Sequence, residues 1–387
     1  MHGALFELGF ILLVLFAGGF LADRLKQSVI PAYILIGVAS RGLVQGDQFI
    51  GTLAEAGLVL LMFFIGLEFS LPSFIPGWRR TVRSGFIDLL FNFPVGVLFG
   101  LLSGMGTLHS LYLGAIVYMS STAIITKTMV DNRLSAMPES AVILKVLVFE
   151  DLLVAVMIAL LAGLGAGGGG LAGSALVMLK VAAFLAALVF MFRKGLPYIN
   201  RVFAVESSEL FIMLGLGFVV VVASAGSASG LSEAVGAFVA GMLFSETAHK
   251  RRAEEKLRPF KDLFSAIFFL NFGLGIAYEG IWGVAGAAAL LTVLAFAGKM
   301  AGGWAIGRSE GLSGRASVGV GVGLLARGEF SIIIAGLIPA CMDDSGLCTN
   351  LPALAAVFVL VTGITGGVAM KEFPRAWFWY KGRKSGG

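Results

Sequence analysis

Two neighbouring carboxylates interrupt an apolar stretch of the chain. The stretch LVFEDLLVAVM, residues 147–157, contains Glu150 and Asp151 among mostly apolar residues. A carboxylate in an apolar medium is costly, so ionisable residues at such positions are candidates for function. Neighbours on a helix point about 100° apart, so one acid can face a water-filled cavity while the other faces a neighbouring helix. An acid that reaches water can bind a proton or a dehydrated cation. The alternative is a buried ion pair or hydrogen-bonded acid that only holds helices together.

Lys299 is the natural counter-charge for these acids. It lies in AFAGKMAGGWAIG, residues 295–307, where small residues would let another helix approach closely. A lysine near the end of a span can also extend its ammonium to the membrane interface. The sequence leaves both interpretations of Lys299 open.

Two apolar segments have polar interruptions near their centres. The segment at 109–128 contains SST at residues 120–122, and the segment at 316–341 contains Arg327 and Glu329. Corresponding interrupted segments are typical of transporters, in which unwound helices expose backbone carbonyls and helix-dipole ends beside an ion site. We therefore predict two crossed discontinuous helices at these positions.

The side chains at the interruptions have predicted roles. Thr122 and Ser121, with nearby freed carbonyls, are candidate cation ligands. Oppositely directed half-helices place partial charges of both signs at one point, and Arg327 and Glu329 would neutralise them. The alternative for the two hydroxyl residues is ordinary helix packing.

The composition indicates which kind of chain carries these groups. Hydrophobic residues make up 58% of the 387 residues, charged residues only 13%, and the mean hydropathy is +0.94. Apolar runs long enough to cross roughly 30 Å of hydrocarbon as helices recur from end to end. We expect an all-α polytopic membrane protein. The thirteen expected segments are 4–22, 28–44, 50–70, 84–104, 109–128, 138–163, 171–193, 208–226, 231–246, 259–277, 280–306, 316–341 and 351–371.

The loop charges predict the orientation of these segments. Twenty-three of the 28 lysines and arginines lie in one set of alternate junctions or in the C-terminal tail, whereas the other set contains only Arg41. Cytoplasmic loops carry the excess of basic residues, so we expect the N-terminus outside and the C-terminus in the cytoplasm. The plasma, or inner, membrane is the expected location. The net charge of +5 is therefore an orientation signal and does not indicate nucleic-acid binding.

The remaining sequence features concern internal repeats, domain content, cofactors and a possible disulfide. The run GAGGGG, residues 165–170, would link two inverted six-helix repeats around a seventh segment. Residues 1–387 are expected to form a single transmembrane domain without a C-terminal soluble domain. The sequence has no zinc or haem spacing, so we expect no cofactor. Cys341 and Cys348 share an outward loop, where they would form a disulfide or remain separate thiols.

Two further acids lie near the ends of apolar segments. Glu68 ends LMFFIGLE, and Asp262 enters the segment at 259–277. Both are expected near the cytoplasmic interface, where they would line an entrance or simply be solvated.

Eight stretches, in order along almost the whole chain, resemble a known family. They are PAYILIGVASRG (31–42), LMFFIGLEFS (61–70), SSTAIITKTM (120–129), FED (149–151), LSEAVGAFVAGMLF (231–244), LFSAIFFLNFGL (263–274), GKMAGG (298–303) and LLARGEFSIIIAG (324–336). The chain thereby resembles the second family of monovalent cation:proton antiporters, which includes Kef-type potassium/proton and NapA-type sodium/proton antiporters. The resemblance implies thirteen helices, a homodimer, and a dimerisation part beside a mobile core part.

The resemblance also implies roles for individual residues. Asp151 matches the acid that alternately binds cation and proton, and Glu150 would pair with Lys299. Relatives carry Asp-Asp, Asn-Asp or Gln-Asp where this chain has Glu-Asp, which leaves ion selectivity and stoichiometry open. Kef-type relatives have a regulatory C-terminal domain, so either the chain is truncated or regulation lies on a separate cytoplasmic subunit. The basic loop 249–261 would be a landing surface for such a subunit, although the excess of basic residues in cytoplasmic loops explains this loop equally well.

The expected function is secondary active antiport by alternating access. K⁺ or Na⁺ would be exchanged for H⁺, and these ions would be cargo rather than cofactors. A passive cation channel is the first alternative, although one polar cluster between apolar ends does not make a continuous pore. A transport-silent sensor is another alternative. An intramembrane aspartyl protease ranks last, because Asp151 is the one convincing acid of its type at mid-depth.

Overall fold

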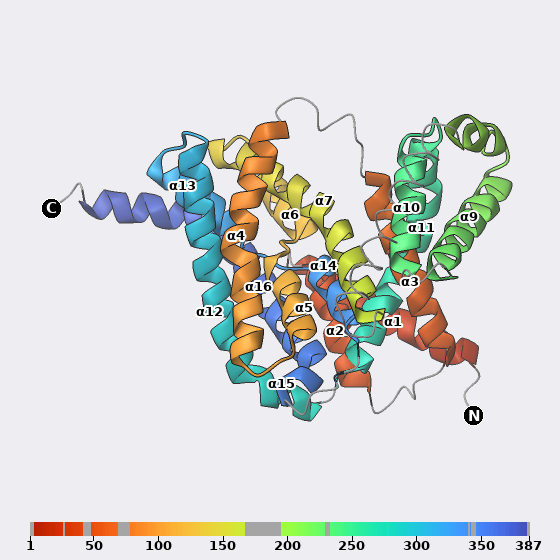
Figure 1. Ribbon diagram of the computed structural model, residues 1–387, viewed down its shortest axis with the longest axis horizontal. Helices are drawn as coiled ribbons and strands as arrows, with labels where there is room; N and C mark the ends of the chain where they lie inside the picture. Colours follow the sequence, from red (N-terminus) through yellow and green to blue (C-terminus); the bar gives the residue numbers. More distant parts are fainter. Residues whose placement is uncertain are drawn as a thin grey trace. The chain divides into compact units, whose positions relative to one another are not determined.

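The computed structural model describes residues 4–25, 28–41, 48–68, 78–166, 195–228, 233–276, 278–339, 341 and 346–384. The described residues form helices and connections and contain no strand, which confirms the all-α prediction. Figure 1 shows the order of the helices along the chain. The expected segment at 171–193 lies outside the described residues, so the count of thirteen and the inverted repeats stay predictions.

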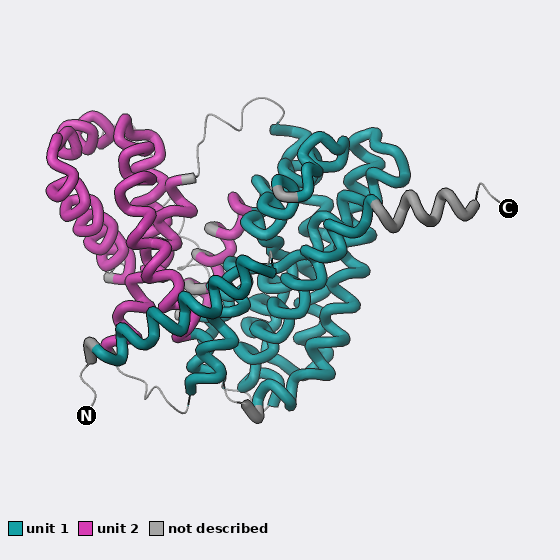
Figure 2. Tube along the Cα trace, turned by 180° about the vertical axis from the view of Figure 1, so that it is seen from behind, with its two compact units in different colours: residues 1–43, 77–150, 272–387 teal, residues 44–76, 151–271 magenta. Residues whose placement is uncertain are grey.

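The chain divides into two compact units (Figure 2). Unit 1 comprises residues 1–43, 77–150 and 272–387, and unit 2 comprises residues 44–76 and 151–271. The division falls inside one continuous helix, α7 (Pro138–Ala166), between Glu150 and Asp151.

Unit 1 contains most of the helices and all of the buried ion pairs described below. Besides the first part of α7, its helices are α1 (Ala4–Arg24), α2 (Val29–Ser40), α4 (Trp78–Leu102), α5 (Thr107–Tyr118), α6 (Thr122–Asp131), α12 (Tyr278–Ser309), α13 (Gly314–Gly323), α14 (Glu329–Gly336), α15 (Gly346–Thr349) and α16 (Leu351–Lys384).

Glycines bring the helices of unit 1 close together. A Cβ on Gly303 of α12 would meet the backbone of Gly321 on α13, and a Cβ on Gly96 of α4 would meet the backbone around Gly114 on α5. Small residues at such crossings let helix backbones approach in a membrane protein, where apolar burial drives packing weakly. These contacts tie α4, α5, α12 and α13 into one bundle.

Unit 2 contains α3 (Gln48–Glu68), α9 (Ser208–Ala228), α10 (Glu233–Ser245) and all but the last three residues of α11 (Lys250–Leu274), besides the second part of α7. Gly66 on α3 and Gly241 on α10 lie where a Cβ would meet the opposite backbone. A set of edge-to-face phenylalanines, whose ring centroids are 4.6–6.0 Å apart, packs beside this crossing: Phe63, Phe203, Phe211, Phe218 and Phe244.

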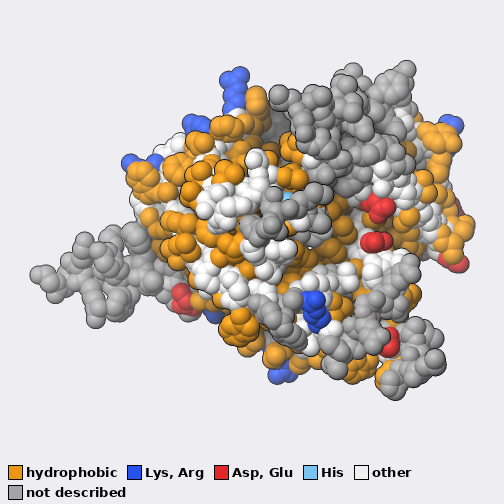
Figure 3. Space-filling view, turned by 60° about the horizontal axis from the view of Figure 1, so that its bottom comes forward, with side chains coloured by type: hydrophobic (Ala, Val, Ile, Leu, Met, Phe, Trp, Pro, Cys, Tyr) orange, Lys and Arg blue, Asp and Glu red, His pale blue; other side chains and the backbone are white. Residues whose placement is uncertain are grey.

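The surface and the helix lengths agree with a multi-pass membrane protein. Seven helices of the described part are long and apolar enough to span a bilayer, and α2 and α10 are shorter apolar helices. Helix α1 exposes Phe6, Phe10, Leu13, Phe16 and Phe20, side chains suited to lipid contact. Figure 3 shows a face on which hydrophobic side chains predominate over charged ones.

Several expected boundaries were wrong, and the largest difference is in the last segment, where α16 continues to Lys384 instead of ending at 371. Helix α4 begins at Trp78 rather than near residue 84, and the second interrupted segment ends at Gly336 rather than at 341. The stretch expected as the loop 249–261 is helical from Lys250 and forms the first turns of α11. The sequence estimate followed hydropathy. It excluded charged residues from α4, α11 and α16, which extend beyond their apolar parts, and it included the apolar residues after Gly336, which lie beyond the end of α14.

Candidate functional site

Two helices of unit 1 are interrupted, at the places where the sequence has its polar breaks. Residues 119–121 separate α5 from α6, and residues 324–328 separate α13 from α14. The backbone N–H of Ser121 donates to the carbonyl of Ala326 at 2.8 Å, so the two breaks lie directly against each other. Ser331 of α14 adds a second link, because its hydroxyl donates to the carbonyl of Ile116 in α5 at 2.8 Å. Figure 1 labels these short helices, which belong to the teal unit of Figure 2.

Arg327 binds the carbonyl ends of both broken helices. Its Nε donates to the carbonyl of Val117 at 2.8 Å, and its Nη1 donates to the carbonyls of Leu324 and Leu325 at 2.9 and 2.8 Å. Val117 lies in the last turn of α5, and Leu324 follows the last residue of α13. The last carbonyls of a helix lack intrahelical partners and carry partial negative charge. The fully buried guanidinium of Arg327 therefore compensates two helix C-termini at once.

Glu329 lies beside the N-termini of α14 and α6, the second halves of the two broken helices. It is the first residue of α14, and its Oε2 accepts a hydrogen bond from the Ser121 hydroxyl at 3.1 Å. Ser121 is the N-cap of α6, where its oxygen also accepts the N–H of Ile124 at 3.3 Å. Negative charge is favoured at helix N-termini, so Glu329 is suited to both α14 and α6. The Arg327–Glu329 pair thus occupies the ends that its charges complement.

Glu150 joins α7 to the first break. Its carboxylate accepts the backbone N–H of Ser120 and, at 2.9 Å, the hydroxyl of the same serine. Lys299 of α12 donates to Glu150 Oε1 at 2.8 Å. Neither charged side chain is exposed to solvent. The ion pair that the resemblance implied is therefore present, and Lys299 does not extend to the interface.

Asp88 of α4 is a second acid on the same lysine, and sequence reasoning missed it. Lys299 Nζ donates to Asp88 Oδ2 at 2.7 Å, and neither side chain is exposed. Asn92, one turn further along α4, donates to Asp88 Oδ1 at 3.0 Å and to its carbonyl at 2.8 Å. The apolar segment was expected to begin at 84, and sequence reasoning assigned no role to Asp88. The signal that could have found it is an acid and an amide four residues apart on one face of an apolar helix.

Asp151 and Thr122 are the other two residues that the sequence analysis predicted as cation ligands, besides Ser121 and Glu150. Asp151 follows Glu150 on α7 and is partly exposed, and Thr122 is the first residue of α6 and is also partly exposed. The carbonyl of Thr122 accepts the Thr126 hydroxyl at 2.6 Å. Whether Asp151, Thr122 and Ser121 share a cation stays a prediction.

The remaining predicted site residues belong to other elements than these breaks. The side chain of Glu68, the last residue of α3, lies outside the described part. Asp262 of α11 pairs with Lys261 at 2.9 Å and is largely exposed, so it is a surface residue in unit 2. The structure joins Cys341 to Cys348 by a disulfide, which closes the connection between α14 and α16.

A second cluster of charges joins α4, α7 and the end of α12. Arg83 and Lys145 donate to the Glu310 carboxylate at 3.2 and 3.3 Å, and the Ser84 hydroxyl donates at 3.3 Å. Glu310 directly follows the last residue of α12. Burial alone would raise the pKa of Glu310, but the hydrogen bond and charge of Lys145, with hydrogen bonds from Arg83 and Ser84, hold this pKa below its usual value. Sequence reasoning assigned no role to this cluster.

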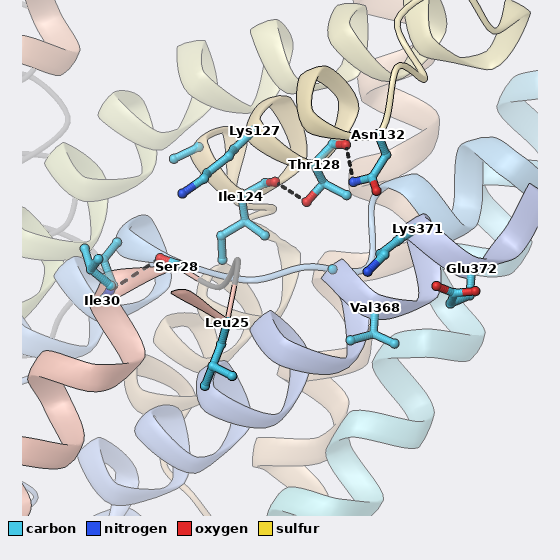
Figure 4. A pocket seen from close by; sticks show the side chains of 13 residues that line it. Leu25, Ser28, Ile30, Ile124, Lys127, Thr128, Asn132, Val368, Lys371 and Glu372 are labelled. Carbon is cyan, nitrogen blue, oxygen red and sulfur yellow. Dashed lines mark hydrogen bonds between the residues drawn. The ribbon is translucent and has the colours of Figure 1, made fainter. Parts of the chain in front are cut away.

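A cavity of about 300 Å³ lies elsewhere in unit 1, between the start of α2, helix α6 and helix α16. Figure 4 shows Lys127, Thr128 and Asn132 of α6 with Lys371 of α16 at this cavity. Its lining residues are Leu25, Ser28, Val29, Ile30, Ala123, Ile124, Lys127, Thr128, Asn132, Gly367, Val368, Lys371 and Glu372. The residues of the Asp88–Lys299–Glu150 cluster are not among them.

Comparison with known proteins identifies the family. A family model described as "sodium/hydrogen exchanger, transmembrane" matches residues 11–373. The chain belongs to the sodium/hydrogen exchanger family. The match includes both broken helices and every buried charge described above.

Two relatives and one solved structure extend this assignment. The chain is 34% identical to the K(+)/H(+) antiporter subunit KhtU of Bacillus subtilis, over 97% of this chain and 95% of that protein. It is 32% identical to the ammonium/H(+) antiporter subunit AmhT of Alkalihalophilus pseudofirmus, over 98% and 96% of the two chains. The structure resembles that of the sodium proton antiporter MjNhaP1 from Methanocaldococcus jannaschii, with a TM-score of 0.68, 14% identity and 96% coverage of each chain. That likeness supports the fold.

Proposed function

We propose that this chain exchanges a monovalent cation, K⁺ or Na⁺, for protons by alternating access, with Asp151 as the exchanging acid. The family makes the chain a secondary cation/proton antiporter rather than an enzyme. The observation that carries the proposal is the Glu150–Lys299 ion pair against the break between α5 and α6. This pair fixes the rotation of α7 about its axis and directs the next residue, Asp151, about 100° away from Lys299.

The coupling would follow from the cost of moving a bare charge. Deprotonated Asp151 would bind the cation with help from Thr122, Ser121 and freed carbonyls of the break. An ionised carboxylate without cation or proton is expensive to carry through the membrane. The site would therefore cross only when it is loaded with one or the other. A passive channel would instead conduct the cation without moving protons.

The identity of the cation is the finer part of the proposal. The two relatives above are named for K⁺ and for ammonium, and the structural neighbour is named for sodium. K⁺ is the first candidate, because the relative at 34% identity is named for it. The transport of K⁺ or Na⁺ against H⁺ would contribute to pH homeostasis.

The assembly and the location also belong to this proposal. We expect a homodimer in the plasma (inner) membrane, with the N-terminus outside and the C-terminus in the cytoplasm, because of the distribution of lysine and arginine. Both relatives are named as antiporter subunits, which supports a separate cytoplasmic regulatory partner for this chain. The basic first turns of α11, with Lys250, Arg251 and Arg252, would face that partner.

The test is cation-dependent proton movement in proteoliposomes. A pulse of K⁺ or Na⁺ should collapse a preset pH gradient in the wild type, whereas Asp151→Asn should give no response. Glu255→Gln, an exposed acid paired with Arg251 on α11, is the matched control and should respond as the wild type does. Absence of a response to K⁺ and Na⁺ in folded wild-type protein, or a normal response in Asp151→Asn, would overturn the proposal.

A further inference from the structure

A histidine and two cysteines meet near the start of α5, apart from the broken helices and the buried ion pairs. His109 lies in the first turn of α5, Cys341 in the connection after α14, and Cys348 in α15. Their ligand atoms, one ring nitrogen and two sulfurs, all lie within 4.8 Å of one another. His109 and Cys348 are buried and Cys341 is partly buried. Three metal-binding side chains thus converge from three elements of unit 1.

A backbone carbonyl orients the histidine ring. His109 Nε2 lies 3.2 Å from the carbonyl oxygen of Pro339, which can only accept, so Nε2 carries the proton of this hydrogen bond. In the neutral ring, Nδ1 then has the lone pair that a metal ion needs. Histidines that bind metals almost always donate their other ring N–H to a carboxylate, a backbone carbonyl or water, which fixes the tautomer. The Pro339 carbonyl gives His109 this arrangement.

The three donors fit a tetrahedral zinc ion. Zn²⁺ binds cysteine thiolate at about 2.3 Å and imidazole nitrogen at about 2.0–2.1 Å, so the ligand atoms of such a centre lie about 3.5–3.8 Å apart. That separation falls within the 4.8 Å that spans the atoms of this group. Two thiolates also cancel the charge of the ion, which lowers the cost of burying it. Three protein ligands with a fourth position for water form a known zinc arrangement.

The disulfide between Cys341 and Cys348 is the alternative state of the same two sulfurs. The thiolate, and not the disulfide, is a metal ligand. A dithiol reductant converts the disulfide to two thiols and is itself oxidised to a disulfide. One Zn²⁺ then takes the place of the two thiol protons, which are released to the solvent. The two Cα atoms are 6.0 Å apart, so rotation of the side chains can separate the sulfurs while the backbone stays in place.

We propose that His109, Cys341 and Cys348 bind Zn²⁺, or a transition-metal ion of similar preference, when the two cysteines are reduced. The spacing of the sequence did not reveal this group, because His109 is far from the cysteines along the chain. The disulfide joins only the connection after α14 to α15. The metal ion adds α5 to this link through His109. Oxidation of the cysteines releases the ion and removes its tether on α5.

The test is a titration with Co²⁺, which replaces Zn²⁺ in such sites and absorbs visible light. The protein is purified without a histidine tag, reduced with dithiothreitol and freed of reductant under argon. The reduced wild type should bind one Co²⁺ per chain, with a thiolate-to-cobalt charge-transfer band and the strong visible bands of a tetrahedral site. Zn²⁺ should displace the Co²⁺ and abolish both signals. The oxidised wild type, whose sulfurs are bonded to each other, should give neither signal.

Three variants identify the ligands. His109→Ala should keep the charge-transfer band but bind Co²⁺ at least about tenfold more weakly, because loss of even an outer-shell partner costs about 10–100-fold in affinity. The double variant Cys341→Ser, Cys348→Ser should lose the charge-transfer band. His249→Ala is the matched control, because His249 Nε2 also lies beside a backbone carbonyl, that of Asn200 in unit 2. This variant should bind Co²⁺ as the wild type does.

Each outcome supports or overturns the site. Release of two thiols per chain by dithiothreitol, followed by the cobalt bands, supports it. A disulfide that resists reduction in the folded protein, or a reduced wild type without a thiolate–cobalt band, overturns it. Equal affinity of His109→Ala and the wild type overturns the role of His109. The comparison of reduced and oxidised wild type needs no variant, so it decides the question even where a variant does not fold.

Discussion

The same three helices are joined by ion pairs at two places in unit 1, with opposite arrangements of charge. In the buried cluster, acids on α4 and α7, Asp88 and Glu150, share a base on α12, Lys299. In the terminal cluster, bases on α4 and α7, Arg83 and Lys145, share an acid that follows α12, Glu310. The three side chains of the buried cluster have no exposure, whereas in the terminal cluster Glu310 is 5% exposed and its partners Arg83 and Lys145 are 52% and 37% exposed.

The difference in burial separates a functional cluster from a structural one. A buried ion pair recovers its desolvation cost only when every partner is in place, so it is poor evidence for a stabilising role. An ion pair at the surface costs little and contributes about 0–1 kcal/mol. Apolar side chains of similar size would stabilise the mid-helix positions of Asp88, Glu150 and Lys299 at least as well. The presence of charges there favours a role in transport. The terminal cluster holds the helix ends together at small cost.

Replacement of the shared lysine should have the largest effect. Lys299→Ala leaves Asp88 and Glu150 without their common partner. We expect a loss of about 3–5 kcal/mol in the free energy of unfolding, together with loss of exchange. Lys145→Ala, on the terminal cluster, is the matched control and should cost less than about 1 kcal/mol. Chemical denaturation in detergent and proteoliposome flux measure the two effects; equal losses in both variants would erase the distinction between the clusters.

Replacement of the arginine at the breaks should have the next largest effect. Arg327→Lys keeps the charge but loses the fork that reaches Val117, Leu324 and Leu325. Each lost hydrogen bond to a charged donor contributes about 1.5–3 kcal/mol. We expect a stability loss of at least that size and slower exchange. Arg83→Lys should leave both quantities nearly unchanged, and a comparable loss there would contradict the contrast.

Replacement of the terminal acid should have a small effect on stability and none on coupling. Glu310→Gln removes the ion pairs to Arg83 and Lys145 but can keep a hydrogen bond at that place. We expect a loss of about 1 kcal/mol or less, which decreases further at high salt because exposed pairs are screened. Thermal unfolding at low and high ionic strength measures it. A changed proton-to-cation ratio in Glu310→Gln would show that the terminal cluster takes part in transport, which would contradict its structural role.

The pH dependence of the terminal cluster gives the smallest predicted effect. The pKa of Glu310 is lower in the folded protein than in the unfolded chain, where it is about 4.3. Its contribution to stability is therefore complete above that value and is lost as the pH falls through the folded pKa. The difference in unfolding free energy between the wild type and Glu310→Gln should shrink in this acidic window. If the difference in unfolding free energy between the wild type and Glu310→Gln grew on acidification, the pKa of Glu310 would not be lowered in the folded protein.

Sequence reasoning found the charged and polar residues that lie in the middle of long apolar segments, because hydropathy shows that such residues lie deep in the membrane. Glu150 and Arg327 stand in the middle of long apolar runs, and the polar breaks around Ser121 and Glu329 interrupt segments that would otherwise be continuous. The pairing of Glu150 with Lys299 came from the resemblance rather than from spacing, because 149 residues separate them.

The residues that sequence reasoning missed lie where helix ends are ambiguous. Asp88 lies only four residues after the expected start of its segment at 84, whereas α4 begins at Trp78, about three turns before Asp88. Glu310 reads as an ordinary loop acid, and its two bases come from helices that are distant in sequence. Tertiary contacts of this kind leave no periodic signal, because each partner sits on a helix whose own pattern is apolar.

The most direct test of the account is the number of protons released when the cation binds. Titration calorimetry of the solubilised protein with K⁺ or Na⁺, in two buffers of different ionisation enthalpy, counts them at constant pH. The account predicts proton release on cation binding in the wild type, and neither heat of binding nor proton release in Asp151→Asn. Cation binding without proton release in the wild type, or unchanged release in Asp151→Asn, would contradict exchange at Asp151.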